Sequence, residues 1–182
     1  MHARFRIANL VVFQIVWLAC VWGASVRMAW LGPLAAALFV VWHLRYTDTR
    51  ASDLRLIAIA IPMGVVVDSL FAASGWFDYA SAWPAASVAP VWIIAMWVGF
   101  ALTLNHSMAF LRGRMAWAAL FGLIGGPLAY WGAASGFAAV HFTVPTLWAL
   151  TAVAVAWGLA LPALYLSESR WSKHLAVASA PA

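Results

Sequence analysis

The stretch Pro90–Phe110, PVWIIAMWVGFALTLNHSMAF, begins as an apolar run and ends with Asn105, His106 and Ser107 close together. No turn-forming cluster divides it, so we expect one membrane helix over about 88–110. Polar groups in lipid cost free energy unless they are paired. The stretch therefore predicts a helix that lies inside a bundle.

The composition extends this interpretation to the whole chain. Of the 182 residues, 66% are hydrophobic and 8% are charged, whereas about a quarter of the residues of soluble domains are charged. Residues 1–182 are expected to form one all-α, polytopic membrane domain with six transmembrane helices, since each apolar run approaches the ~20 residues that cross a bilayer. The predicted spans are about 7–26, 29–46, 54–73, 88–110, 115–136 and 142–166.

The basic residues predict the orientation of these spans. Nine of the ten Lys and Arg residues lie before the first span, in the second and fourth loops or after the last span, and only Arg27 lies in another loop. Cytoplasmic loops carry the excess of basic residues, so both termini are expected inside a bacterial inner membrane. Because the charges are spread over short loops, nucleic acid is not an expected partner.

The N-terminus also has the basic start and apolar run of a signal peptide. However, the run Ile7–Ser25 has about 19 residues, which is long enough to span. Trp17 is bulky where a cleaved segment usually carries small or aliphatic residues. We expect the first helix to be retained.

Polar residues within the spans fall into two layers. At about 1.5 Å per residue, the inner layer lies within roughly 10 Å of the cytoplasmic helix ends. We predict that it lines a polar cavity, although hydrogen bonds that only fix helix packing explain any single residue equally well. On a continuous helix, Asn105 would point away from His106, so the fourth span should be the most enclosed. The cavity candidates are Gln14, His43, Thr103, Asn105, His106 and Ser107, with Asn9 at the same depth.

The outer layer consists of Asp68 and Tyr130. Asp68 lies about 21 Å along the third span from Leu54, so we expect no contact between Asp68 and His106. Asp68 is either a proton-carrying carboxylate or a neutral acid that bonds Tyr130 or a backbone carbonyl.

Catalytic and metal motifs are weak. His43 and His106 lack an HExxH pattern, a cysteine ligand and any carboxylate expected at their level, so no metal or other cofactor is predicted. Ser107 lacks the GxSxG context of a serine hydrolase. The glycine pairs Gly122/Gly126 and Gly132/Gly136 predict close helix contact in the fifth span.

Four segments resemble a family of small bacterial inner-membrane proteins that is catalogued as domain of unknown function 2878. They are NLVVFQIVWLACVWGA (9–24), VDSL around Asp68, PVWIIAMWVGFALTLNHSMAFLRGR (90–114) and GGPLAYWGAASGFAAV (125–140). The resemblance covers residues 9 to about 166 and implies no established site. It implies proximity to fatty-acid or phospholipid-modifying enzymes, and so lipid-modifying enzymes as partners.

The leading functional hypothesis is an accessory or lipid-handling protein of the inner membrane, with its polar cavity facing the inner leaflet. A second is a small proton-coupled transporter, a homo-oligomer that uses Asp68 as its coupling carboxylate. A third is an intramembrane lipid-modifying enzyme with His106 as general base or metal ligand.

Overall fold

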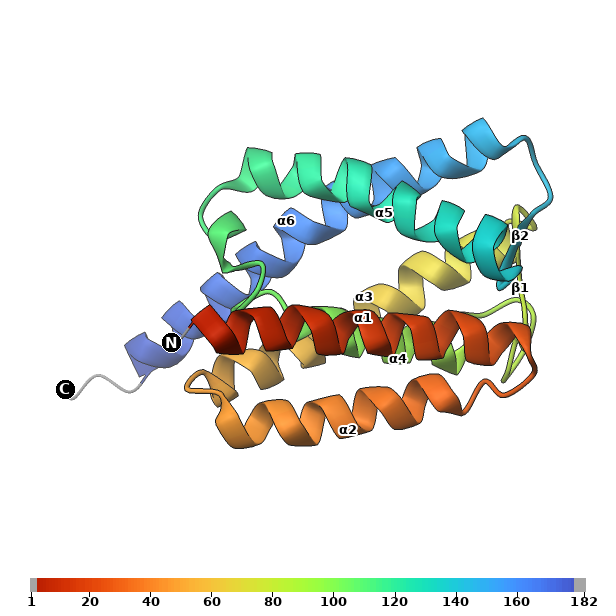
Figure 1. Ribbon diagram of the computed structural model, residues 1–182. Coiled ribbons are helices and arrows are strands. Elements are labelled where there is room, and N and C mark those ends of the chain that lie inside the picture. The colour runs from red at the N-terminus through yellow and green to blue at the C-terminus, as the bar shows by residue number, and fades with distance from the viewer. Residues whose placement is uncertain (1–2, 179–182) are drawn as a thin grey trace.

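The computed structural model describes residues 3–178 and shows six α-helices and a small two-stranded sheet (Figure 1). Strands β1 (Phe77–Tyr79) and β2 (Val140–Phe142) pair antiparallel across a long separation in the chain, with Asp78 opposite His141. The expected all-α fold is confirmed, and this small sheet, which we call the β1–β2 sheet, was not predicted. The helices are α1 (Ala3–Ser25), α2 (Leu31–Tyr46), α3 (Arg50–Ala73), α4 (Val91–Ala101), α5 (Met115–Phe137) and α6 (Thr146–Ala178), with a 3-10 turn, η1, at Ala109–Leu111.

Three of these helices are long and apolar enough to cross a membrane: α1, α3 and the part of α6 from Thr146 to His174. Their outward faces carry large apolar side chains, such as Leu18 on α1 and Leu70 on α3, which remain exposed. Contiguous exposed apolar surface of this kind is unusual for a soluble monomer and is expected where lipid surrounds a bundle.

The two ends of the bundle differ in charge. In Figure 1 the start of α1, the α2–α3 and α4–α5 connections and the end of α6 lie at one end, and the β1–β2 sheet lies at the other. We call the first the basic end because it gathers Arg4, Arg6, Arg45, Arg50, Arg55, Arg112, Arg114, Arg170 and Lys173.

Helix α4 is the most enclosed helix, as predicted. It packs against α1, α2 and α3, and seven of its eleven residues are buried. Its Trp97 ring stacks on Trp157 of α6 with ring centroids 4.6 Å apart. A Cβ at Gly64 of α3 would lie 2.5 Å from the Trp97 ring, so a glycine there allows this large side chain into the core.

The expectation of one helix over about 88–110 is wrong at its second half, because α4 ends at Ala101. Residues 102–108 form successive turns, which we call the 102–108 turn. The Thr103 hydroxyl donates a 2.7 Å hydrogen bond to the Phe100 carbonyl. Such local side-chain bonds compete with helix hydrogen bonding.

Side chains of other helices replace the helix hydrogen bonds that the 102–108 turn gives up. The Leu102 carbonyl accepts a 3.1 Å bond from Asn9 Nδ2 of α1. The Tyr165 hydroxyl of α6 lies 3.3 Å from the Leu104 carbonyl and 2.9 Å from the Met108 carbonyl. Buried irregular backbone needs partners for its polar groups, and these two side chains provide them for three carbonyls of the turn.

Helices α5 and α6 pack closely through one of the two predicted glycine pairs. A Cβ at Gly122 would lie 2.1 Å from the Trp157 carbonyl oxygen, and one at Gly126 would lie 2.6 Å from the Trp157 ring. The other pair, Gly132 and Gly136, makes no such close approach. The contact therefore depends on Gly122 and Gly126.

A matched pair of substitutions in α5 tests this packing. Gly122→Ala should lower the free energy of unfolding by about 1–3 kcal/mol, because the added methyl overlaps α6 backbone. Gly136→Ala meets nothing within 4 Å and should be neutral or stabilising by up to ~1 kcal/mol through helix propensity. Thermal unfolding in detergent, followed by circular dichroism, measures both. Equal stability of the two variants would contradict the close contact.

Candidate functional site

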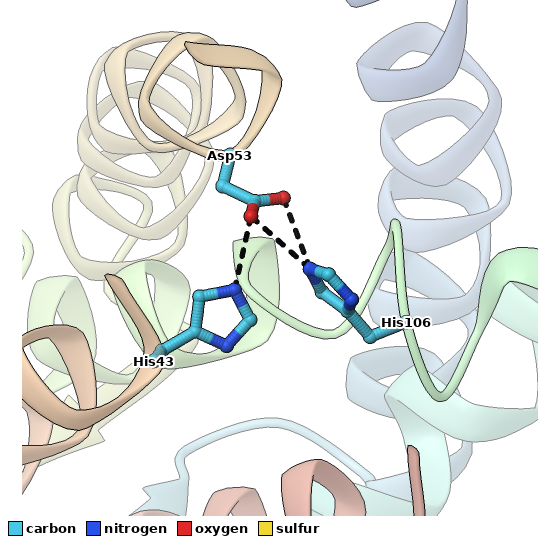
Figure 2. Close-up of side chains that lie close together, drawn as sticks. All are labelled: His43, Asp53 and His106. Carbon is cyan, nitrogen blue, oxygen red and sulfur yellow. Dashed lines mark hydrogen bonds and ion pairs between the residues drawn. The ribbon is translucent and has the colours of Figure 1, made fainter. Parts of the chain in front are cut away.

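Asp53, in the first turn of α3, is completely buried and lies between two histidines. His43 Nε2 of α2 lies 3.0 Å from Asp53 Oδ2. His106 Nε2 of the 102–108 turn lies 3.1 Å from Oδ2 and 3.2 Å from Oδ1. Figure 2 shows both imidazoles directed at the carboxylate, which therefore joins three separate elements.

Three further side chains donate to the same carboxylate. Thr47 Oγ1 and Thr49 Oγ1 lie 2.7 and 3.0 Å from Oδ2, and Asn105 Nδ2 lies 2.7 Å from Oδ1. An ionised carboxylate only accepts, at about four lone-pair sites, so five donors saturate it. We call this group the Asp53 cluster: Asp53, His43, His106, Thr47, Thr49 and Asn105.

Asn9 of α1 fixes the proton positions of His43. Its Oδ1 accepts the Ser107 hydroxyl at 2.7 Å and lies 3.4 Å from the Ser107 amide N–H. Its Nδ2 therefore faces the Leu102 carbonyl at 3.1 Å and His43 Nδ1 at 3.3 Å. An amide nitrogen donates, so His43 Nδ1 accepts, and His43 Nε2 carries the proton that is donated to Asp53. The tautomer follows from this hydrogen-bond network.

His106 differs from His43 at its second nitrogen. Its Nδ1 is buried and has no hydrogen-bond partner among the residues that the structure describes. The ring is nevertheless packed tightly, with the His43 centroid at 4.5 Å and the Phe5 centroid at 5.4 Å. Phe5 also lies against His43 and stacks on Trp42. His106 Nδ1 is thus unpaired among the described residues, and Phe5 packs on both imidazole rings.

Three residues of the Asp53 cluster could together ligate a metal ion. One ligand atom each of His43, Asp53 and His106 lies within 4.8 Å of the others, and two histidines with one carboxylate form a common transition-metal set. A metal on both Nε2 atoms would move each proton to Nδ1, where a ligating histidine normally donates to an acceptor.

The surroundings do not provide those acceptors. A proton on His43 Nδ1 would face the Asn9 amide donor, and a proton on His106 Nδ1 would be buried without a partner. An unpaired buried donor costs about 1–3 kcal/mol. The cluster therefore fits a carboxylate with two imidazole N–H donors better than it fits a metal centre.

Two expectations about this region are wrong. We expected no carboxylate at the level of His43 and His106, but α3 begins at Arg50, several residues before the predicted span, which places Asp53 inside the helix. We also expected Asn105 to point away from His106. Both reach Asp53, because the 102–108 turn is not helical. Asp53 is one of only five acidic residues in the chain, a scarcity that could have drawn attention to it.

The predicted inner-layer residues divide between two places. His43, Asn105 and His106 belong to the Asp53 cluster, and Ser107 bonds Asn9 beside it. Gln14 and Thr103 instead line a separate cavity of about 400 Å³ between α1, α4, α5 and α6. We call this cavity the α1–α5 cleft. The side chains around it are mainly apolar and include Phe13, Trp17, Met96, Phe100, Phe121 and Trp157.

Asp68 belongs to a second buried network at the end of the bundle that carries the β1–β2 sheet. It accepts hydrogen bonds from Tyr79 at 2.9 Å, from Trp97 Nε1 at 2.7 Å and from Tyr130. Of the alternatives that the sequence left open for Asp68, the bond to Tyr130 is therefore present. Burial, followed by the charges of Tyr130 and Asp68, raises the pKa of the Tyr79 hydroxyl well above its usual value. Tyr79 therefore stays protonated and donates its hydroxyl proton in the hydrogen bond to Asp68.

A salt-bridge group extends the Asp53 cluster toward α6. Asn105 Nδ2 also lies 2.9 Å from Ser52 Oγ, which donates a 2.7 Å bond to Glu168. Glu168 pairs with Arg55 at 3.1 Å, and Arg112 bonds Asn105. The basic end is therefore joined from α3 to α6 by continuous polar contacts.

These features define an all-α protein in which three of the six described helices are long and apolar enough to span a membrane, with two buried carboxylate networks inside the bundle. The chain belongs to the family described as "Protein of unknown function (DUF2878)", whose model matches residues 6–163. No curated protein and no solved structure matches the chain significantly.

The role of the cluster in stability can be measured directly. Asp53→Ala should lower the free energy of unfolding by about 3–5 kcal/mol, because it leaves buried donors without their acceptor. Asp48→Ala, in the loop before α3 and exposed, should change stability by less than about 0.5 kcal/mol. Chemical or thermal unfolding in detergent gives both values. Similar small losses in the two variants would contradict the central place of Asp53.

Proposed function

We propose that the protein is a lipid-handling protein of the bacterial inner membrane and that the α1–α5 cleft holds the acyl chain of a lipid. The cleft volume of about 400 Å³ lies within the roughly 300–1,000 Å³ range of ligand pockets. Its apolar and aromatic lining is complementary to a hydrocarbon chain. Gln14 and Thr103 supply the few polar groups.

The exposure of several lining residues supports sideways entry from the bilayer. Leu10 of α1 is 46% exposed, and Phe121 and Leu128 of α5 are 44% and 61% exposed. Residues that line a cleft and also face outward mark its open side. An acyl chain that enters between α1 and α5 passes from lipid to protein without crossing water, which avoids the cost of hydrating it.

Two arginines at the basic end favour a phospholipid. Arg6 lies four residues before Leu10 on α1, so it shares the helix face of a residue that lines the cleft. Arg114 directly precedes α5, the helix that carries Phe121. Both arginines are exposed. A guanidinium pairs strongly with phosphate, so the headgroup phosphate is expected near Arg6 and Arg114, with the chain extending toward Tyr130.

This proposal includes six membrane crossings with both termini in the cytoplasm. It is supported by the gathering of nine basic residues at one end of the bundle, since such residues favour the cytoplasmic side. The eleven residues of α4 rise only about 16 Å, so the 102–108 turn completes that crossing inside the protein. Membrane-bound lipid-modifying enzymes are the partners that such a carrier would serve.

Filling the cleft tests lipid binding. A Cβ at Gly125 meets only the Phe121 ring, at 3.5 Å, so the side chain of Gly125→Leu has room to enter the cleft. This variant should retain several-fold less phosphatidylglycerol in native mass spectrometry, because the side chain occupies the chain site. The control is Gly136→Leu, the same change in the same helix at a position with open space. Equal lipid retention by wild type and both variants would contradict the proposal.

The topology is tested with single cysteines. Cys20 is buried and should give little background labelling. In spheroplasts, a membrane-impermeant maleimide should label Ser87→Cys, in the exposed loop between β1 and α4. It should leave Asp48→Cys at the basic end unlabelled until the membrane is permeabilised. The reverse labelling pattern would show the opposite orientation.

A further inference from the structure

We propose that His106 is the acid–base residue of this protein: its Nδ1 exchanges a proton with an O–H group, and Asp53 is the positioning residue. The proposal concerns the Asp53 cluster and does not depend on lipid binding in the cleft. Its starting point is the difference between two neighbouring imidazoles that share one carboxylate.

Only one of these imidazoles has a nitrogen available for chemistry. His43 Nε2 contacts Asp53, and His43 Nδ1 accepts from Asn9. His106 Nε2 also contacts Asp53, but His106 Nδ1 has no partner among the described residues, although the side chain is only 1% exposed. Buried polar atoms are nearly always paired, and an exception calls for an explanation. A ligand or water that binds Nδ1 provides one.

The arrangement of Asp53 and His106 suits proton transfer. When an O–H group gives its proton to Nδ1, the ligand is left as an oxyanion and the ring becomes an imidazolium. The Nε2–H bond to Asp53 remains in place, and the carboxylate stabilises the new positive charge. The reverse step returns the proton to oxygen, so the ring acts as base and then as acid with no net change.

Phe5 packs on both imidazoles, and we infer that it controls access to them. Its ring lies 5.6 Å from the His43 centroid and 5.4 Å from the His106 centroid, and it stacks on Trp42. Phe5 lies in the first turns of α1 and is only partly buried. It is thus the cover between the imidazole pair and the basic end, where phospholipid headgroups and water meet. The partner of Nδ1 is therefore a hydroxyl of a headgroup or of water.

Diethyl pyrocarbonate, which acylates unprotonated imidazole nitrogen, tests this availability residue by residue with peptide mass spectrometry. In the full chain in detergent, Phe5→Ala should raise the labelling rate of His106 several-fold. His43, with both nitrogens engaged, should remain nearly unlabelled, and exposed His141 should label equally in all samples. Phe5→Leu, a milder change, should give a smaller increase and covers the case in which Phe5→Ala does not fold.

The positioning role of Asp53 has its own readout. Asp53→Asn should move the pH profile of His106 labelling to lower pH, because a neutral amide no longer stabilises the imidazolium. The other titratable group packed on the ring is His43, while Arg112 reaches Asp53 through Asn105. A merely structural role for Asp53 predicts faster labelling at every pH with no displacement of the profile.

Nanodiscs distinguish the two sources of the hydroxyl. If His106 is labelled more slowly in phosphatidylglycerol than in phosphatidylcholine, whose headgroup has no hydroxyl, the partner of Nδ1 is a headgroup hydroxyl. If the two labelling rates are equal, the partner is water. The proposal is overturned if His43 labels as fast as His106 in the Phe5 variants, or if His106 stays unlabelled in both.

Discussion

The structure depends on keeping one carboxylate, Asp53, inside a bundle that is otherwise largely apolar. An unpaired buried charge costs far more than any single helix contact provides, so the chain must bring donors to it. Those donors come from α2, from the threonines before α3 and from the 102–108 turn. This requirement accounts for the early end of α4: a continuous helix would point Asn105 and His106 in different directions.

The second carboxylate meets the same requirement at the opposite end by a different route. Asp68 accepts from Tyr79, Tyr130 and Trp97, and these aromatic donors also tie β1 and α5 to α3 and α4. Two buried carboxylate networks thus hold the ends of the bundle together. The α1–α5 cleft lies between them along the helices, lined mainly by apolar side chains, and this is the part of the interior that is suited to a hydrocarbon chain.

The sequence predicted what depends on composition and local periodicity, and it failed where distant side chains determine local structure. Apolar runs located all six helices, and the spacing of the glycines predicted the close approach at Gly122. The end of α4 was not predictable, because Asn9 and Tyr165 replace its helix hydrogen bonds from far along the chain. Asp53 was missed for a related reason, because its partners lie up to 53 residues away. Asp53 also lies between Arg50 and Arg55, so a search for apolar runs assigns it to the loop before the third span.

The protonation of the two imidazoles tests this account most directly. Nitrogen-15 NMR of histidine-labelled protein, with signals assigned by His43→Gln and His106→Gln, reports which ring nitrogens carry protons. The account predicts a proton on Nε2 of both rings, with each signal showing a hydrogen bond to a carboxylate, and an unprotonated Nδ1 on His43. Unprotonated Nε2 atoms on both rings, as metal ligation by these nitrogens would require, would contradict the hydrogen-bonded cluster.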